Sequence, residues 1–159
     1  MKRALCAITL MLAAGGALAQ TLQQGQPAPA AVVEQIKDVP PTRIGQQAVR
    51  AVPPAALSGQ QAKAVAENRR TLVVRDSDNL VGISSNELIV LGTDLDAIAA
   101  SVAAMQLPGA QTHVYPKLKL AVVKTARFEQ LETVRDRLAA AYPDARFDLP
   151  VTYFPRQRR

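Results

Sequence analysis

The order of apolar patterns in the second half of the chain constrains its fold more than any other feature. Six segments follow one another as strand, helix, strand, strand, helix and strand, over residues 87–91, 95–105, 111–115, 118–124, 126–141 and 146–152. The strand segments are short and rich in β-branched and aromatic residues, whereas apolar residues recur every three or four positions in the helical ones. This order predicts an α+β fold, a ferredoxin-like β-α-β-β-α-β sandwich with a four-stranded antiparallel sheet and two helices on one face.

Local signals mark the ends of both predicted helices. Thr93 or Asp94 caps the first helix, and Pro108-Gly109 ends it. Pro143 ends the second helix. The expected buried stripes are Leu95, Ile98, Ala99, Val102 and Met105 in the first helix and Phe128, Leu131, Val134, Leu138 and Ala141 in the second.

The strand predicted over 118–124 carries apolar residues on both faces. Leu118, Leu120 and Val122 form one face, and the opposite face, which begins with Lys119, is only partly polar. We assign the Leu120 face to the helices and expect the other face to meet a partner or a further layer. On this assignment Leu120→Asp unfolds or nearly unfolds the domain, because an unpaired buried carboxylate costs several kcal/mol.

The first 19 residues have the pattern of a secretory signal peptide. Lys2 and Arg3 precede an uncharged apolar stretch over 4–14, and Ala17-Leu18-Ala19 matches an A-x-A cleavage site. We therefore expect a mature chain that begins at Gln20 and is periplasmic or secreted.

Proline dominates the region after the signal. Six of the eleven prolines lie between Pro27 and Pro54, among alanines and glutamines and without an aromatic residue. Such a composition buries too little apolar surface to offset chain entropy, so we expect an extended or disordered arm. Short helices are expected near 30–37 and 58–67, the second capped by Ser58. The expected parts are a signal peptide, the arm, a folded domain and a basic tail, over 1–19, 20–68, 69–155 and 156–159.

No pattern in the mature chain supports catalysis. Cys6, the only cysteine, lies in the signal, so we expect neither a disulfide nor a thiolate site. His113 is the only histidine and lies mid-strand, with no serine or carboxylate placed to form a triad. The acidic run over 76–79 lacks the later glycine and glutamate of a calcium loop and is typical of a turn. We expect no enzyme activity, no metal and no cofactor.

Positive charge is concentrated at the end of the sequence. Loss of the signal lowers the net charge from +6 to +4, and three of these charges lie in Arg156-Gln157-Arg158-Arg159. The rest is close to neutral, so we expect no nucleic-acid partner, and no membrane contact after signal cleavage. Paired basic residues are where furin- and kexin-type subtilases cut, and the sequence ends as the product of such a cut would end. A second pair, Arg69-Arg70, is a candidate processing site at the expected boundary between arm and domain.

These features together resemble the propeptide domains of subtilisin-type serine proteases, in particular the stand-alone external chaperones of kexin-like bacterial proteases. The resemblance rests on residues 118–123, 128–141 and 147–159. It departs from the propeptides in that we expect no protease domain to follow. It implies that an open sheet face packs on two surface helices of a secreted protease, which the chain helps to fold and then inhibits. It also implies that one segment lies in the active-site cleft of the protease: Tyr153, Phe154, Pro155, Arg156, Gln157, Arg158 and Arg159.

Two other functions fit the same patterns. The chain could be a periplasmic interaction module that docks through its open sheet, with the arm as a tether. It could also be a polyanion-binding protein that uses its arginines on lipopolysaccharide or nucleic acid. Truncation of the tail separates these readings, since it changes protease inhibition in the first case and salt-dependent binding to acidic polymers in the last.

Overall fold

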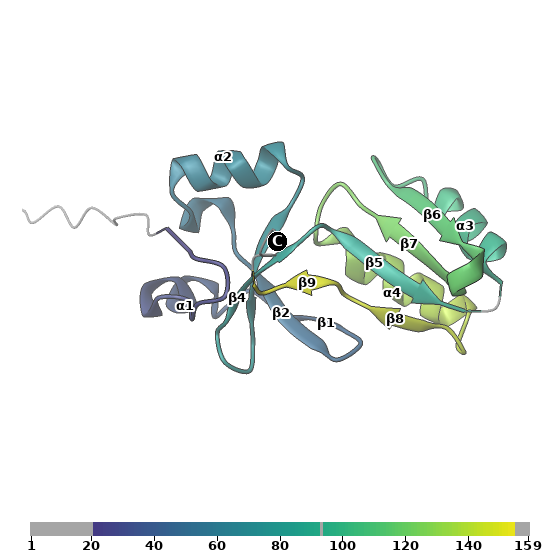
Figure 1. Cartoon of the computed structure of the whole chain (residues 1–159), viewed down its shortest axis with the longest axis horizontal. Helices are drawn as coiled ribbons and strands as arrows, with labels where there is room; N and C mark the ends of the chain where they lie inside the picture. Colours follow the sequence, from purple (N-terminus) through teal and green to yellow (C-terminus); the bar gives the residue numbers. More distant parts are fainter. Residues whose placement is uncertain (1–20, 93, 155–159) are drawn as a thin grey trace, which may run out of the picture.

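The computed structural model describes residues 21–92 and 94–154 and has an α+β fold built on two antiparallel sheets (Figure 1). The elements, with η for short 3-10 turns, are α1 (Ala30–Ile36), β1 (Thr42–Ile44), β2 (Gln47–Ala51), η1 (Pro54–Ala56), α2 (Gly59–Glu67), β3 (Thr71–Arg75), β4 (Val81–Ser84), β5 (Glu87–Leu91), α3 (Leu95–Ala104), β6 (Gln111–Tyr115), η2 (Pro116–Leu118), β7 (Leu120–Lys124), α4 (Gln130–Ala141), β8 (Arg146–Asp148) and β9 (Val151–Thr152). Within the described residues, no helix is long and apolar enough to cross a membrane.

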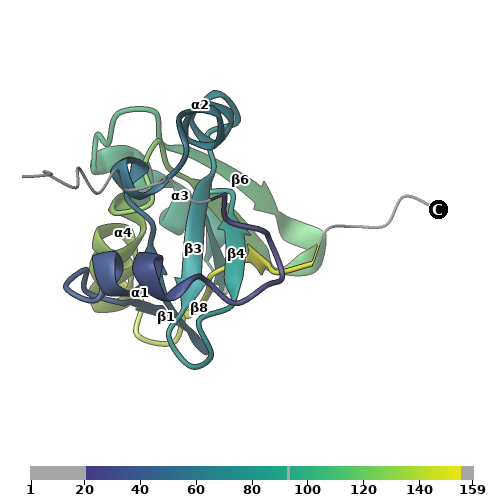
Figure 2. The same ribbon diagram turned by 90° about the vertical axis from the view of Figure 1, so that its left-hand side faces the viewer.

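The first sheet has the strand order β1-β2-β3-β4-β9, with every pair antiparallel. Three consecutive residues of β3 are buried, Leu72, Val73 and Val74, so both faces of this sheet are covered. One face packs against α1 and α2, and Figure 2 shows α1 beside β3 and α2 above it. Val73 on the opposite face belongs to the core shared with the second sheet.

The expectation of an extended or disordered arm was wrong, because residues 21–67 form helices, strands and part of a core. Val32 and Ile36 of α1 are buried together with Val52 and Leu57, against the apolar side of β3 and β4. Composition underestimates this region because its buried apolar residues pack on strands that include β3 and β4, which later sequence supplies. The prolines sit where a missing N–H costs little, for example Pro29 directly before α1 and Pro54 as the first residue of η1.

Both short helices expected in this region are present. Ser58 caps α2, since its hydroxyl oxygen accepts a hydrogen bond from the Gln61 N–H at 3.3 Å. Leu22, before α1, exchanges two hydrogen bonds with the side chain of Gln61, at 3.1 and 2.7 Å. The segment around Leu22 is thereby fixed to α2.

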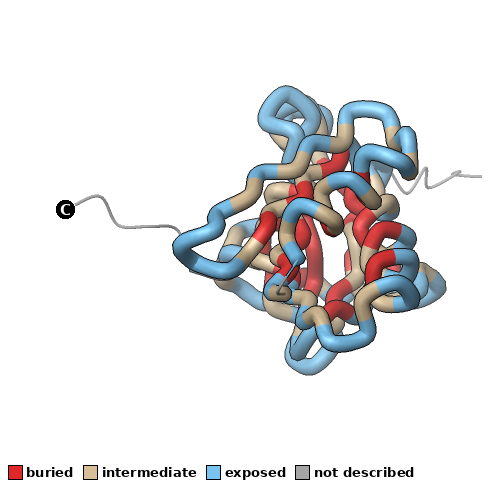
Figure 3. Tube along the Cα trace, turned by 90° about the vertical axis from the view of Figure 1, so that its right-hand side faces the viewer, coloured by how far each residue is buried: buried red, intermediate tan, exposed pale blue. Residues whose placement is uncertain are grey.

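The second sheet has the strand order β6-β7-β5-β8, again antiparallel throughout. The helices α3 and α4 pack on one face, behind the strands in Figure 1, and both predicted stripes supply buried residues. Figure 3 shows buried segments between strands and helices and exposed ones outside. The buried side chains shared by this sheet and its helices are Leu88, Val90, Ile98, Val102, Ala121, Val123, Phe128, Leu131, Val134 and Leu138.

The expected single four-stranded sheet is therefore incomplete, since the structure has sheets of five and four strands. The last predicted strand is divided: β8 joins the second sheet and β9 joins the first. Leu149 and Pro150 make the crossing between them. Proline has no N–H to give to a ladder, so it favours a break at this point.

The face assignment of β7 was also wrong. Ala121 and Val123 are fully buried toward the helices, whereas Leu120 and Val122 lie on the other side and are partly exposed. Leu118 belongs to η2 and is 65% exposed. Both faces of this strand are apolar, so alternation alone could not tell which one meets the helices. The prediction that Leu120→Asp unfolds the domain depended on this assignment and no longer follows.

Candidate functional site

One face of the second sheet carries no helix, and we call it the open face. Strand register aligns its residues in three rows that run across the sheet. The rows are Gln111, Lys124 and Glu87; His113, Val122, Ile89 and Asp148; and Tyr115, Leu120, Leu91 and Arg146. The open face therefore has an apolar centre and a polar or charged rim.

On the open face, the large apolar side chains that are most exposed lie in the last of these rows and on the turn beside it. Leu91 is 41% exposed and Tyr115 is 46% exposed, while Leu118 lies on the adjoining turn. At the opposite end of the rows, the Lys124 ammonium lies 3.4 Å from the Glu87 carboxylate. An apolar centre bounded by charged side chains is the usual anatomy of a protein-binding surface.

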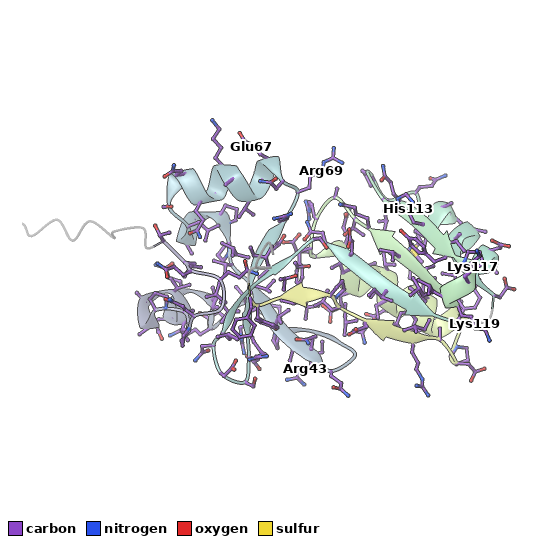
Figure 4. The ribbon with its side chains drawn as sticks, viewed as in Figure 1. Arg43, Glu67, Arg69, His113, Lys117 and Lys119 are labelled. Atoms are coloured by element: carbon purple, nitrogen blue, oxygen red, sulfur yellow. The ribbon has the colours of Figure 1, made fainter. Side chains whose placement is uncertain are left out.

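His113, the only histidine, is exposed on the edge strand β6. Figure 4 shows it on that strand, with Lys117 and Lys119 at the other end of the sheet. Its neighbour across the ladder is Val122, so register gives it no catalytic partner. Among residues 21–92 and 94–154, no group of three or more His, Cys, Asp or Glu side chains is placed to hold a metal ion.

The C-terminal segment runs along the first sheet. Thr152 of β9 pairs with Ile83 of β4. The Tyr153 hydroxyl donates a hydrogen bond of 3.0 Å to Gln47 Oε1, and the Arg75 guanidinium lies 4.4 Å from the centre of its ring. Burial raises the pKa of Tyr153, and the nearby Arg75 charge opposes that rise. Tyr153 is thus held by the molecule's own sheet, although the sequence predicts it in a protease cleft.

The remaining predicted cleft residues divide into two sets. Phe154 is 69% exposed. Pro155, Arg156, Gln157, Arg158 and Arg159 lie outside the described residues.

The Arg69-Arg70 pair ends α2 rather than separating an arm from a domain. Arg69 has a left-handed backbone, with φ of 48°. Its N–H donates to the Ala66 carbonyl at 3.1 Å, and the Arg70 N–H donates to the Val65 carbonyl at 3.0 Å. Such a hydrogen-bonded helix end is not the extended backbone that a protease binds. Cleavage after Arg70 stays a prediction. The geometry implies that a protease would cut there only in molecules whose helix end has unfolded locally.

A cleft of about 580 Å³ lies between the proline segment, α2 and the start of α4. Its lining is mostly apolar and includes Pro53, Leu57, Val65 and Phe128. Asn86 also lines it and is only 2% exposed, and its Oδ1 finds no hydrogen-bond partner among the described residues. No sequence signal predicts this cleft, because its walls come from segments about 90 residues apart.

No protein-family model, no curated protein and no solved structure matches this chain. The function proposed below therefore depends on the open face and on the sequence of the C-terminal segment.

Proposed function

We propose that this chain is an exported, non-catalytic binding protein that assists the folding of a secreted subtilisin/kexin-like serine protease and then inhibits it. The observation that carries the proposal is the open face, an exposed apolar surface on a sheet whose opposite face is fully packed. The chain leaves this sheet after β8, joins the first sheet at β9 and continues into a dibasic segment.

The proposal includes a more specific description of the fold of the second sheet and its helices. We take β5 to β8, with α3 and α4, as a ferredoxin-like unit. Its element order and its strand order β8-β5-β7-β6 support that description, as does the placement of both helices on one face. The five-stranded sheet is then an addition to the unit. Folds of this kind host many functions, so the description of the fold does not by itself favour a protease partner.

The open face fits docking on a folded protein surface. Leu91, Leu120 and Val122 would supply the apolar contact, and the charged rim would set orientation. Helices on the surface of a subtilase would provide the complementary ridge. A binding protein that prefers the folded protease to the unfolded chain stabilises the folded form by mass action. It also lowers the barrier to a parallel sheet that needs many non-local contacts.

The basic segment fits the cleft of a kexin-like protease. Carboxylates line such a cleft, and the planar fork of arginine pairs with them through two parallel hydrogen bonds. In this proposal Arg159 occupies the pocket before the scissile position, Arg158 the next pocket and Arg156 the fourth. A segment bound in these pockets would keep substrate out of the cleft, which is the inhibition that we propose.

Deletion of 156–159 tests the proposal. We expect it to leave the fold intact and to weaken inhibition of a kexin-like subtilase by roughly a hundredfold or more, since each charged pair contributes about 1.5–3 kcal/mol. The measurement is a titration of the protease with the full-length and shortened proteins. Arg158→Lys with Arg159→Lys is the matched control, because it keeps the charge and removes the fork.

Equal inhibition constants for the full-length and shortened proteins would remove the basic segment from the mechanism. The open face would then support a general periplasmic interaction module as the better account. A loss that appears only as weaker, salt-dependent binding to heparin would indicate polyanion binding instead.

A further inference from the structure

The two residues that precede Phe154 are gripped by the N-terminal half of the molecule. The Gln24 side-chain amide donates a hydrogen bond of 2.8 Å to the Thr152 carbonyl. The Tyr153 hydroxyl donates to Gln47, at the start of β2. These contacts join residues 128 and 106 positions apart in the sequence.

Tyr153 can lie close to the sheet because Gly82 and Gly25, which contact it, have no side chain. A Cβ at Gly82 on β4 would lie 2.5 Å from a Val151 methyl group and 2.9 Å from the Tyr153 ring. Gly25 has φ of +80°, and a Cβ there would lie 2.7 Å from the Tyr153 carbonyl oxygen. A side chain at either position would force Val151 or Tyr153 to shift, and at Gly25 it would also strain the backbone.

The cover over the ring is also held in place. Arg75 stacks on Tyr153, and the Asp78 carboxylate accepts two hydrogen bonds from the Arg75 guanidinium, at 2.8 and 2.5 Å. This hydrogen bonding lowers the pKa of Asp78 and raises the pKa of Arg75. Both groups therefore stay charged, and the guanidinium plane keeps the orientation that a cation–π contact needs.

We propose that the N-terminal half is a clamp that fixes the position and direction of the C-terminal segment, with Tyr153 as its anchor. Gln24, Gln47 and Arg75 are positioning residues that act through Tyr153 and Thr152. The use of this clamp rests on the proposed function. Asp148 on the rim of the open face is only five residues before Tyr153, so the clamp sets where the basic segment starts relative to the docking surface.

Such a clamp would raise affinity without contacting the protease. A segment already held at its base loses less freedom when it enters a cleft, and binding of the open face presents it at high effective concentration. This gives the proline-rich region a function that composition did not suggest. It is a scaffold for the inhibitory segment rather than a tether.

The first test does not involve a protease. Amide hydrogen exchange of the peptide over 146–154 is measured in the wild type, Arg75→Ala and Tyr153→Phe. Arg43→Ala is the matched control, because Arg43 is an exposed arginine on β1 of the same sheet (Figure 4). We expect faster exchange in Arg75→Ala and Tyr153→Phe, and exchange at the wild-type rate in Arg43→Ala. Unchanged exchange in Arg75→Ala and Tyr153→Phe overturns the clamp, whatever a protease does.

The second test measures whether the clamp acts through the basic segment. Arg75→Ala is placed in the full-length protein and in the protein lacking 156–159, and inhibition of a kexin-like subtilase is measured. We expect about tenfold weaker inhibition in the full-length protein, the equivalent of freeing about one backbone residue, and no change in the shortened one. An equal loss in both proteins would mean that Arg75 only supports the fold and would overturn the positioning role.

The outcomes separate this inference from the proposed function. If deletion of 156–159 weakens inhibition and Arg75→Ala does not, the positioning role is overturned and the proposed function stands. If that deletion changes nothing while exchange still accelerates in Arg75→Ala, the proposed function fails and the clamp itself stands.

Discussion

The two sheets of this molecule bury their strands in different ways. In the first sheet β3 is buried on both sides, between the N-terminal helices and the core shared with the second sheet. In the second sheet β7 is buried on one side only, and the other side carries partly exposed valine and leucine. A sheet covered on both faces is scaffold, whereas an exposed apolar face on an otherwise packed sheet is available to a partner.

The largest changes in stability that test this comparison are expected when aspartate replaces valine at adjacent positions of one strand. Val73→Asp and Val74→Asp should each unfold the protein or nearly so, because both positions are buried and an unpaired carboxylate costs several kcal/mol there. Val123→Asp should do the same, whereas Val122→Asp on the open face should lower stability by only about 1 kcal/mol. Urea unfolding followed by circular dichroism measures all four.

Each position is the control for its neighbour, since the substitution and the strand are the same. A tolerated Val74→Asp would mean that the N-terminal helices do not cover the first sheet. Unfolding by Val122→Asp would mean that the open face is buried in the free protein.

The smallest effect concerns acid and belongs to the first sheet. The hydrogen bond from Arg75 holds the pKa of Asp78 below its ordinary value of 3.8, with burial acting in the opposite direction. A lowered folded-state pKa contributes stability above the ordinary value, and this contribution is lost as the pH falls through the lowered pKa. We expect a small stability difference between the wild type and Asp78→Asn at neutral pH, which shrinks as the pH falls below 3.8. The check is a series of urea unfolding curves over that range, and a difference that stays constant in acid would refute the assignment.

The second half of the fold could be predicted from the sequence because each of its elements carries its own pattern. The stripe of Leu131, Val134 and Leu138 in α4 is buried, as is Phe128 just before the helix. The turn at Pro116-Lys117 joins β6 to β7. These features depend on local spacing. The helical caps at Ser58 and Asp94 are also local, and both accept the expected backbone hydrogen bond.

The first half could not be predicted because its order comes from distant partners. Ile36 and Val52 are buried only because β3 and β4 lie beneath them. The average composition of the region does not show that a few apolar residues are placed to meet these strands. The same limit applies to the site. The Tyr153 hydroxyl is fixed by Gln47, 106 residues earlier, and no local pattern around either residue indicates that pairing. The glycine at position 82 leaves room for the side chains of Val151 and Tyr153. It is the one sequence feature that would have indicated this site, and only with the strand register known.

Affinity of the open face for a kexin-like subtilase is the measurement that tests the account most directly. The protease is used with its nucleophilic serine replaced by alanine, so that binding is measured without cleavage. Wild type is compared with Val122→Asp and with Gln60→Asp, a control that introduces the same charge at an exposed position of α2. We predict that Val122→Asp binds at least about thirtyfold more weakly, as expected for a central interface residue, and that Gln60→Asp binds as the wild type does. Equal affinity of Val122→Asp and the wild type, with both folded, would contradict the central claim that the open face is the docking surface.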